Sequence, residues 1–205
     1  MSEYHKIETL YERDEKTFKV KVGVFKNRTY TLLKTWHWTE KVDGTNIRFI
    51  WKDGKLTFGG KSDNAQLHAD LVKWMTENVT EDKMREIFPD VEAVVYGEGY
   101  GAGIQKGGNY SPTKKVIIFD VLVGGTWWLN DENMRDVAAK IGLEAVPYFG
   151  EMALEDATEM VRSGFDSRCA VVAGTKAEGL VGRPLETLFD KKGHRLIVKL
   201  KTKDF

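Results

Sequence analysis

Lysines and carboxylates that could do chemistry stand at separated points of the chain, and the first is Lys41. It comes two residues before Asp43-Gly44 in the stretch TEKVDGTNIRF, where a strand-like run begins. A lysine nucleophile must lose a proton whose reference pKa is about 10.4, and burial or neighbouring cations favour that loss. Asp43 alone favours the charged ammonium. The motif therefore predicts a reactive lysine only where other cations dominate, and a solvated surface lysine is the alternative.

Such cations are predicted on the last strand, in the stretch RLIVKLKTK. Alternate residues of a strand share a face, so Lys199 and Lys201 lie side by side while Leu196, Val198 and Leu200 face the core. The two lysines form a strip suited to binding phosphate, and they supply the positive field that a reactive Lys41 needs. The alternative is a solvated edge strand that lysines protect from further pairing.

Three carboxylates complete the candidate chemistry. Glu98 lies between glycines in YGEGYG, where the backbone can approach a ligand closely, and its two oxygens suit a ribose diol. Asp120 interrupts the apolar strand IIFDVLV and should meet a cation or hydrogen-bond donors. Glu178, in AEGLVGRP, could hold magnesium near phosphates. For each of them, an acid that reaches solvent is the alternative.

Composition excludes several classes of protein. Lys plus Arg and Asp plus Glu both number 31, so binding to nucleic acid would need a local basic face. The single cysteine, Cys169, allows no internal disulfide and reads as a small buried hydrophobe. The four histidines lack the spacing of a helical metal site. No apolar run is long enough to cross a membrane, and the charged N-terminal stretch is no signal peptide.

The elements that position these residues can be predicted coarsely. The stretch 46–61 predicts a β-hairpin around Asp53-Gly54, with Trp51 facing Leu56, Phe49 facing Phe58, and Asn46 brought opposite Lys61. Patterns of apolar residues and caps predict helices at 62–79 (capped by Ser62 or Asp63), 81–88, 130–142 (between Asn130 and Gly142) and 154–164. Strands are expected at 91–98, 115–123 and 126–129, with a short strand within 177–184 that follows Glu178 and its glycine, and a terminal hairpin at 188–205.

Strands and helices follow one another without strict alternation. This order favours an α+β fold with largely antiparallel sheets and flanking helices over a doubly wound parallel sheet. We find no internal repeat and no long linker, so we expect one domain, 1–205, with no C-terminal OB-fold or helical accessory domain.

Taken in order, these segments resemble the motifs of the covalent nucleotidyltransferase superfamily of ATP-dependent ligases and capping enzymes, whose catalytic domain is ATP-grasp-like. Residues 41–46 (KVDGTN) look like motif I, Glu98 stands where motif III has its acid, and IIFDV looks like motif IIIa. EGLVGR looks like motif IV, and the lysines of KLK look like motif V. Three features resemble phage RNA ligases that seal nicks: Asn46 after Asp-Gly-Thr, the stretch FGGKSDNAQ, and the glycine-rich stretch after Glu98.

The resemblance implies a role for each residue. Lys41 would attack the α-phosphorus of ATP to give lysyl-AMP, AMP would pass to a 5′-phosphate, and a 3′-hydroxyl would then close the strand. The nucleotide would be held by Glu40, Asn46, Lys61, Glu98, Tyr110, Lys199 and Lys201, with Tyr110 as an adenine platform. Glu178 and Asp120 would serve Mg²⁺ or Mn²⁺. Lys61 stands where the family commonly has arginine. Lysine keeps the charge but lacks the planar fork of hydrogen-bond donors that arginine has.

The resemblance also implies partners and a location. RNA, or an RNA-containing duplex with a nick, is the expected partner of an intracellular, phage-like enzyme, and the oligomeric state is open. ATP is favoured over NAD because only 40 residues precede Lys41. Two alternatives stay open: a minimal DNA ligase or end-adenylating enzyme, and a nucleotide- or nucleic-acid-binding module with little turnover.

Overall fold

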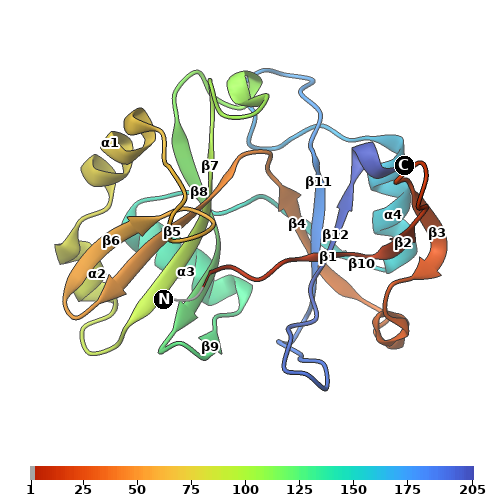
Figure 1. Cartoon of the computed structure of the whole chain (residues 1–205), viewed down its shortest axis with the longest axis horizontal. Coiled ribbons are helices and arrows are strands. Elements are labelled where there is room, and N and C mark those ends of the chain that lie inside the picture. Colours follow the sequence, from red (N-terminus) through yellow and green to blue (C-terminus); the bar gives the residue numbers. More distant parts are fainter. Residues whose placement is uncertain (1–2) are drawn as a thin grey trace. The chain divides into compact units, whose positions relative to one another are not determined.

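The computed structural model describes residues 3–205, which fall into two compact units that the chain visits alternately (Figure 1). Unit 1 comprises the residues up to His5, Asp43–Val146 and Ala170–Val172. Unit 2 comprises Lys6–Val42, Pro147–Cys169 and Ala173–Phe205. Each unit has its own sheet and its own apolar core. None of the helices found in residues 3–205 is long and apolar enough to cross a membrane.

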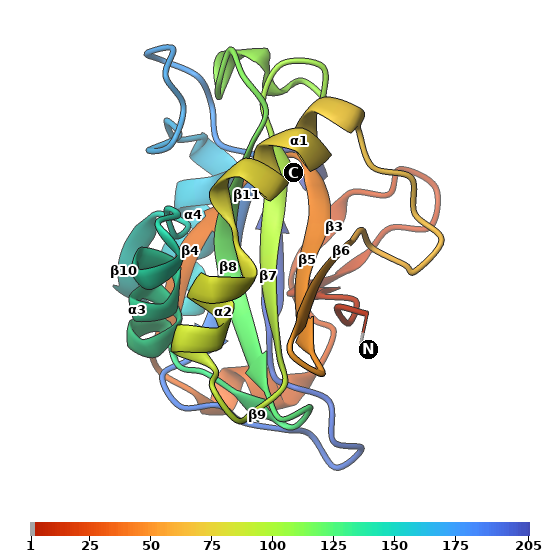
Figure 2. The same cartoon turned by 90° about the vertical axis from the view of Figure 1, so that its left-hand side faces the viewer.

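Unit 1 is built on a five-stranded antiparallel sheet in the order β6-β5-β7-β8-β9. Its strands are β5 (Thr45–Lys52), β6 (Lys55–Gly59), β7 (Ala93–Tyr100), β8 (Lys115–Val123) and β9 (Trp127–Trp128). Three helices, α1 (Ala69–Asn78), α2 (Glu81–Ile87) and α3 (Asp131–Ile141), cover one face of this sheet (Figure 2). Apolar side chains such as Phe49 and Met134 fill the core between helices and sheet, while Asn46 and Arg48 lie on the opposite face of β5.

Several predicted boundaries in unit 1 are confirmed because local chemistry fixes them. The Asn130 side chain accepts a hydrogen bond from the Asn133 amide and caps α3, and Gly142 ends that helix with φ of 89°. The hairpin register is confirmed for Trp51 opposite Leu56 and for Phe49 opposite Phe58. β8 has the predicted bounds.

Two predictions around residues 59–68 are wrong. The ladder between β5 and β6 ends at Arg48 opposite Gly59, so Asn46 does not pair with Lys61; its partner across the sheet is Glu98 on β7. The predicted helix at 62–79 is helical only from Ala69. The residue that precedes the helix is His68, and the Asp63 carboxylate accepts a hydrogen bond from Arg48.

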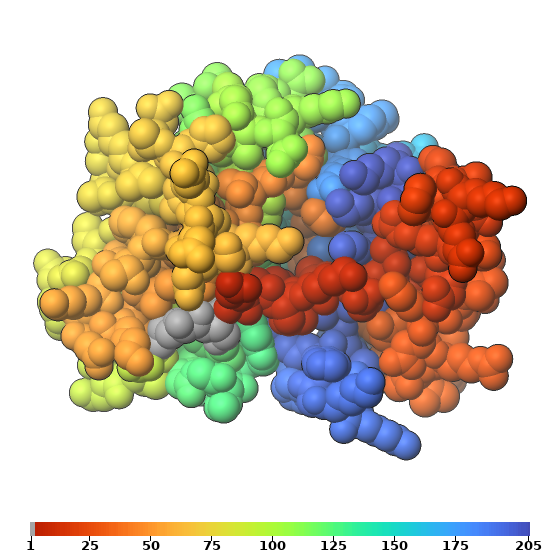
Figure 3. Space-filling model, viewed as in Figure 1, coloured from red at the N-terminus to blue at the C-terminus, as the bar shows by residue number. Residues whose placement is uncertain are grey.

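Unit 2 contains a second five-stranded sheet, in the order β1-β12-β11-β4-β10. The strands are β1 (Glu8–Thr9), β4 (Trp36–Lys41), β10 (Tyr148–Met152), β11 (Gly179–Pro184) and β12 (Val198–Lys201), antiparallel except for β1 beside β12. Helix α4 (Leu154–Ser163) packs on one face, over Trp36, Trp38 and Leu180. A separate hairpin of β2 (Tyr11–Arg13) and β3 (Val20–Phe25) lies at the surface (Figure 3), where Phe18 is 68% exposed.

The predicted C-terminal hairpin is also wrong. β12 pairs with β11 and β1, and residues 188–195 form a loop with one isolated bridge between Phe189 and Arg195. The Asp190 carboxylate accepts from the backbone amides of Lys192 and His194, which closes a tight turn at 190–194. The pairing across this turn is short, with backbone hydrogen bonds from Asp190 to His194 and from Leu196 to Leu188. Within β12 the predicted alternation holds, because Val198 and Leu200 are buried in the core.

Candidate active site

Lys41 and Lys201 end two strands that flank β11, and both lie opposite the same residue. In the sheet of unit 2, Gly179 on β11 pairs with Lys41 of β4 on one side and with Lys201 of β12 on the other. Directly opposed residues share a face, so both lysines point away from the core that α4 covers. The next row of the same face holds Thr39, Val181 and Lys199. Strand pairing thus gathers the predicted nucleophile and the two predicted phosphate-binding lysines.

One carboxylate binds two of these lysines. The Lys41 ammonium lies 2.6 Å from Glu178 Oε2, and the Lys201 ammonium lies 2.6 Å from Glu178 Oε1. All three side chains are mostly shielded, with 13–22% of their surface exposed. Burial alone would raise the pKa of Glu178, but the two ammonium groups outweigh it and lower that pKa. The carboxylate is therefore ionised at neutral pH and bridges two cations.

Gly179 makes this arrangement possible. A Cβ atom at this position would overlap the carbonyl oxygen of Leu200 on the neighbouring strand, so only glycine allows β11 and β12 to approach this closely. The backbone of Glu178 is fixed as well, because its carbonyl accepts a hydrogen bond from the Thr202 amide at 2.9 Å.

Lys199 is the cation of the cluster that can lose its charge in a physiological range. Burial, then the neighbouring Lys201 and Lys41, lower the pKa of Lys199 to about 8. The three lysines and Glu178 together carry a net positive charge at neutral pH, which suits a polyphosphate. The motif around Lys41 predicts a reactive lysine only where cations outnumber carboxylates, and this cluster meets that condition.

Glu40 faces away from the lysine cluster. Its carboxylate is 2% exposed and accepts hydrogen bonds from the Ser167 hydroxyl at 2.5 Å and the Arg168 amide at 2.9 Å. The Cys169 thiol also donates to Glu40 at 3.4 Å, and burial raises the pKa of that thiol to about 12. The side chain of Glu40 thus anchors the loop at 167–169, and only its backbone lies along the Lys41 strand. No motif in the sequence pointed to Ser167 or Arg168.

Unit 1 pairs two other predicted nucleotide-binding residues. Asn46 on β5 lies directly opposite Glu98 on β7. The Asn46 Oδ1 atom is buried and has no hydrogen-bond partner within the described chain, which is unusual for a buried acceptor unless a ligand supplies the donor. A Cβ atom on Gly44 would overlap the Gly99 carbonyl oxygen and lie 2.9 Å from Glu98 Cγ. Gly44 is therefore needed for close packing beside Glu98.

Asp120 has a structural partner. It is fully buried, and its Oδ2 atom accepts a hydrogen bond from the Tyr4 hydroxyl at 2.7 Å. The Tyr4 ring packs against the rings of Tyr96, Phe119 and Trp128. Asp120 therefore ties the N-terminal segment to the sheet of unit 1, which gives it a role that the prediction of a metal ligand did not foresee.

Lys61 and Tyr110 differ in exposure. Lys61 is exposed, on the turn that follows β6. Tyr110 is 4% exposed and follows the short 3-10 helix Gly107–Asn109, with its ring 6.4 Å from that of Tyr100. Tyr110 is thus buried beside the Tyr100 ring, and its role as an adenine platform stays a prediction.

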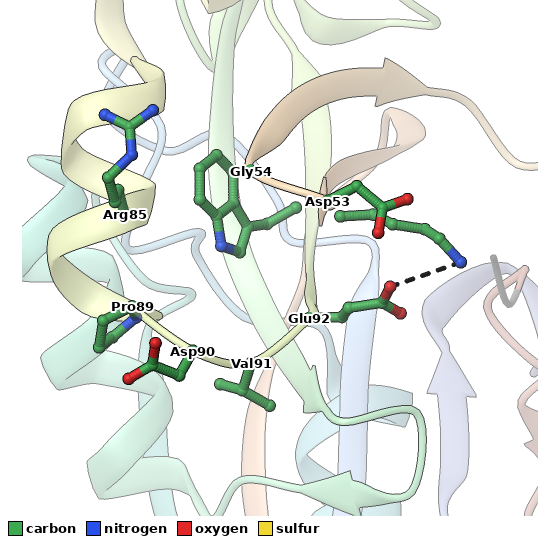
Figure 4. A pocket seen from close by; sticks show the side chains of 9 residues that line it. Asp53, Gly54, Arg85, Pro89, Asp90, Val91 and Glu92 are labelled. Carbon is green, nitrogen blue, oxygen red and sulfur yellow. Dashed lines mark ion pairs between the residues drawn. The ribbon is translucent and has the colours of Figure 1, made fainter.

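A hollow at the tip of the β5–β6 hairpin lies in unit 1 (Figure 4). It has a volume of about 290 Å³ and is lined by Trp51 and Arg85, whose guanidinium lies 5.9 Å from the indole centroid, and by three acids. Glu92, one of these acids, pairs with Lys52 at 3.4 Å. None of the predicted catalytic or nucleotide-binding residues lines it.

The donor atoms can be tested for a divalent cation. Within residues 3–205 no group of three or more His, Cys, Asp or Glu side chains is arranged to hold a metal by itself. Mg²⁺ commonly binds through one or two carboxylates together with the phosphates of a substrate. Glu178, ionised beside Lys41 and Lys201, fits that mode.

Comparison with known proteins adds an independent finding. A family model described as RNA ligase matches residues 34–201, which include Lys41 at one end and Lys201 at the other. No curated protein sequence matches the chain.

Solved structures of an RNA ligase from Naegleria gruberi have a similar fold. A variant with ATP and manganese has a TM-score of 0.68 and 17% identity, over 97% of this chain and 62% of that chain. A variant with AMP and manganese has a TM-score of 0.66 and 17% identity, over 97% of this chain and 60% of that chain. At such identities the likeness shows the fold, and the chain spans about three fifths of the length of those proteins.

Proposed function

The chain belongs to the RNA ligase family, and from this premise we propose that it is an ATP-dependent RNA ligase that works through a lysyl-AMP intermediate on Lys41. The observation that carries the proposal is the row of Lys41, Gly179 and Lys201 across three strands, with Glu178 bound to both lysines at 2.6 Å. A surface lysine would need neither the glycine nor the shared carboxylate.

In the first step, Lys41 Nζ attacks the α-phosphorus of ATP. A nitrogen–phosphorus bond forms, the bond from the α-phosphorus to the bridging oxygen breaks, and pyrophosphate leaves. Lys199 and Lys201 neutralise the charge that develops on the α-phosphate oxygens, which is the main service that a protein renders to phosphoryl transfer. A lysine attacks phosphorus only as the neutral amine, so this step includes the transfer of a proton from Lys41 Nζ to solvent.

Glu178 has two tasks in this proposal. It binds Lys41 with one oxygen and Lys201 with the other, which keeps the two ammonium groups close together. With ATP, it is the residue that would hold Mg²⁺ or Mn²⁺, which supplies charge neutralisation at the phosphates. Asp120 stays a weaker candidate for that task because Tyr4 already binds its carboxylate.

The remaining residues bind the nucleotide in this proposal. Asn46 and Glu98, paired across β5 and β7, hold the ribose, and the buried Oδ1 of Asn46 receives its donor from the ligand. Lys61 adds a positive charge, and Glu40 contributes its backbone. Tyr110 would be the platform for adenine.

In the later steps, an oxygen of the 5′-phosphate of RNA attacks the phosphorus of lysyl-AMP, and Lys41 leaves and regains its proton. The 3′-hydroxyl then attacks the activated 5′-phosphate, and AMP leaves as the strand closes. We propose that the two ends are presented at a nick in an RNA-containing duplex, inside the cell.

The first test uses ATP labelled in its α-phosphate, with magnesium or manganese. The proposal predicts a covalent protein–AMP adduct that is labile in acid, as a phosphoramidate is. Well-folded protein that forms no adduct would indicate a binding module without turnover. A panel of nicked duplexes with RNA or DNA on the 3′-hydroxyl side then tests the substrate, and sealing of all-DNA nicks alone would favour a DNA ligase.

A further inference from the structure

Arg48 is an arginine inside the unit 1 sheet, on the strand that also carries Asn46. Its side chain is fully buried, although β5 is otherwise apolar around it. A buried guanidinium is costly unless its donors are satisfied. Arg48 Nε donates to the Gly60 carbonyl at 2.7 Å, and Nη2 lies 2.8 Å from Asp63 Oδ1. Both acceptors belong to the segment 59–63, which follows the end of β6.

Gly59 and Gly60 have no Cβ atom, so their backbone can lie close to Arg48 and to the turn that follows. A Cβ atom on Gly59 would lie 3.0–3.3 Å from the Arg48 guanidinium, and one on Gly60 would lie 2.7 Å from Ala65 Cβ. The same Cβ on Gly60 would lie 3.8 Å from the Asn46 carbonyl oxygen, so this backbone passes beside Asn46. The stretch FGGK thus places its backbone against Arg48 and leaves Lys61 exposed at the turn.

Asp63 completes the connection from the surface side. It is 70% exposed, yet the Arg48 guanidinium lowers the pKa of its carboxyl group through a hydrogen bond and charge attraction. The arginine therefore bonds to residues on both sides of Lys61, one before it and one two positions after it. A segment held at both ends has few conformations left, so the residue between them is presented in a defined place.

We propose that Arg48 is a positioning residue that fixes the segment 59–63 and thereby orients Lys61 toward the nucleotide that Asn46 binds. The inference rests on the proposed function, because it assumes that Lys61 contacts ATP. It adds that the position of this cation depends on a buried arginine two residues after Asn46 in the same strand.

The test uses Asp63→Ala, because Asp63 is exposed and the hydrogen bond from Arg48 Nε to the Gly60 carbonyl does not depend on it. Asp70→Ala is the matched control: Asp70 is also an exposed aspartate of unit 1 paired with a cation, Lys114, at 3.2 Å. Amide hydrogen exchange should become about tenfold faster in peptides covering 59–67 of Asp63→Ala and stay unchanged in β7. The control should leave the segment 59–67 as it is in the wild type.

Adduct formation gives the second readout. Asp63→Ala should raise the ATP concentration for half-maximal rate about tenfold and leave the maximal rate within about twofold, since ground-state binding is lost. In a double-mutant cycle, Asp63→Ala should add nothing to Lys61→Ala. Arg48→Lys, which keeps the charge without the fork of donors, should resemble Asp63→Ala.

Three results would overturn the inference: unchanged exchange at 59–67, an unchanged requirement for ATP, or additive effects of Asp63→Ala and Lys61→Ala. Wild-type protein that forms no adduct would instead refute the proposed function, and the exchange measurement would still report whether Arg48 and Asp63 hold the segment.

Discussion

The ammonium of Lys41 lies 2.6 Å from the carboxylate of Glu178. The same carboxylate holds Lys201 through its other oxygen. The proposed nucleophile therefore lies in an ion pair, next to a second cation that the same acid binds. Binding of phosphates and a metal would redistribute these partners.

Glu178→Gln should reduce the rate of adduct formation by at least about 100-fold, because it removes the negative charge that orients two lysines and would hold the metal. The loss of one charge from a partly buried cluster should also lower the free energy of unfolding by about 1–3 kcal/mol. Single-turnover labelling and urea unfolding measure the two effects. Glu186→Gln, an exposed acid in the loop after β11, serves as the control. Equal or faster labelling by Glu178→Gln would mean that the carboxylate only restrains Lys41.

Gly179→Ala should lower the free energy of unfolding by about 1–3 kcal/mol, since the new Cβ must push β11 away from the Leu200 carbonyl. The rate of adduct formation should fall as well, because the shift of β11 increases the distance between Lys41 and Lys201. Urea unfolding followed by circular dichroism checks the first effect. Gly108→Ala is the matched control, as its Cβ would meet open space and should change stability by less than about 0.5 kcal/mol. A stable and active Gly179→Ala would show that the close approach is dispensable.

Asn46→Ala should separate binding from stability. The Oδ1 atom of Asn46 is buried without a hydrogen-bond partner in residues 3–205, so its removal should leave the free energy of unfolding within about 1 kcal/mol of the wild-type value. ATP affinity should fall about tenfold or more. Calorimetric titration with ATP measures this, with Asn78→Ala as a control that loses a bond to the Trp74 carbonyl instead. A destabilised Asn46→Ala with normal ATP affinity would assign Asn46 to the fold.

Lys199 should make ATP binding depend on pH. Burial and neighbouring cations lower its pKa to about 8, so its charge is present below that pH and is lost above it. Phosphate binding needs the charge, and the Kd for ATP should therefore rise above pH 8, by up to tenfold per pH unit.

The measurement uses Lys41→Arg protein, which keeps the positive charge and cannot form the adduct, between pH 7 and 9.5. Adding Lys199→Arg should flatten the profile, because arginine stays charged throughout. A Kd that falls with rising pH, or the same slope in both proteins, would rule out Lys199 as the titrating group.

The sequence predicts the cation strip well because strand alternation is a local rule. Lys199 and Lys201 alternate with Val198 and Leu200, and the structure puts the apolar pair in the core. Asn130 and Gly142 likewise define α3 through local capping chemistry. Such signals depend on neighbours in the chain and need no knowledge of the fold.

Long-range partners were out of reach for the same reason. Asp63 has the local sequence pattern of a helix cap, but its carboxylate accepts a hydrogen bond from Arg48, 15 residues away in the chain. From the sequence alone, Gly179 and Gly44 could be turn residues. Each is needed because the backbone of a neighbouring strand lies too close for a Cβ atom. The strands before Lys41 were missed, although the alternation of Trp36 and Trp38 in TWHWTEK was a usable signal for β4. An arginine amid the apolar residues of NIRFIW was a similar signal for Arg48.

Peptide mapping of the adduct tests most directly whether Lys41 is the nucleophile. The protein is incubated with ATP and magnesium, digested near neutral pH to protect the phosphoramidate, and examined by mass spectrometry. We predict AMP attached to Lys41 in the wild type and no adduct in Lys41→Arg, which keeps the charge but not the nucleophile. AMP found on another residue, or labelling that persists in Lys41→Arg, would contradict the account.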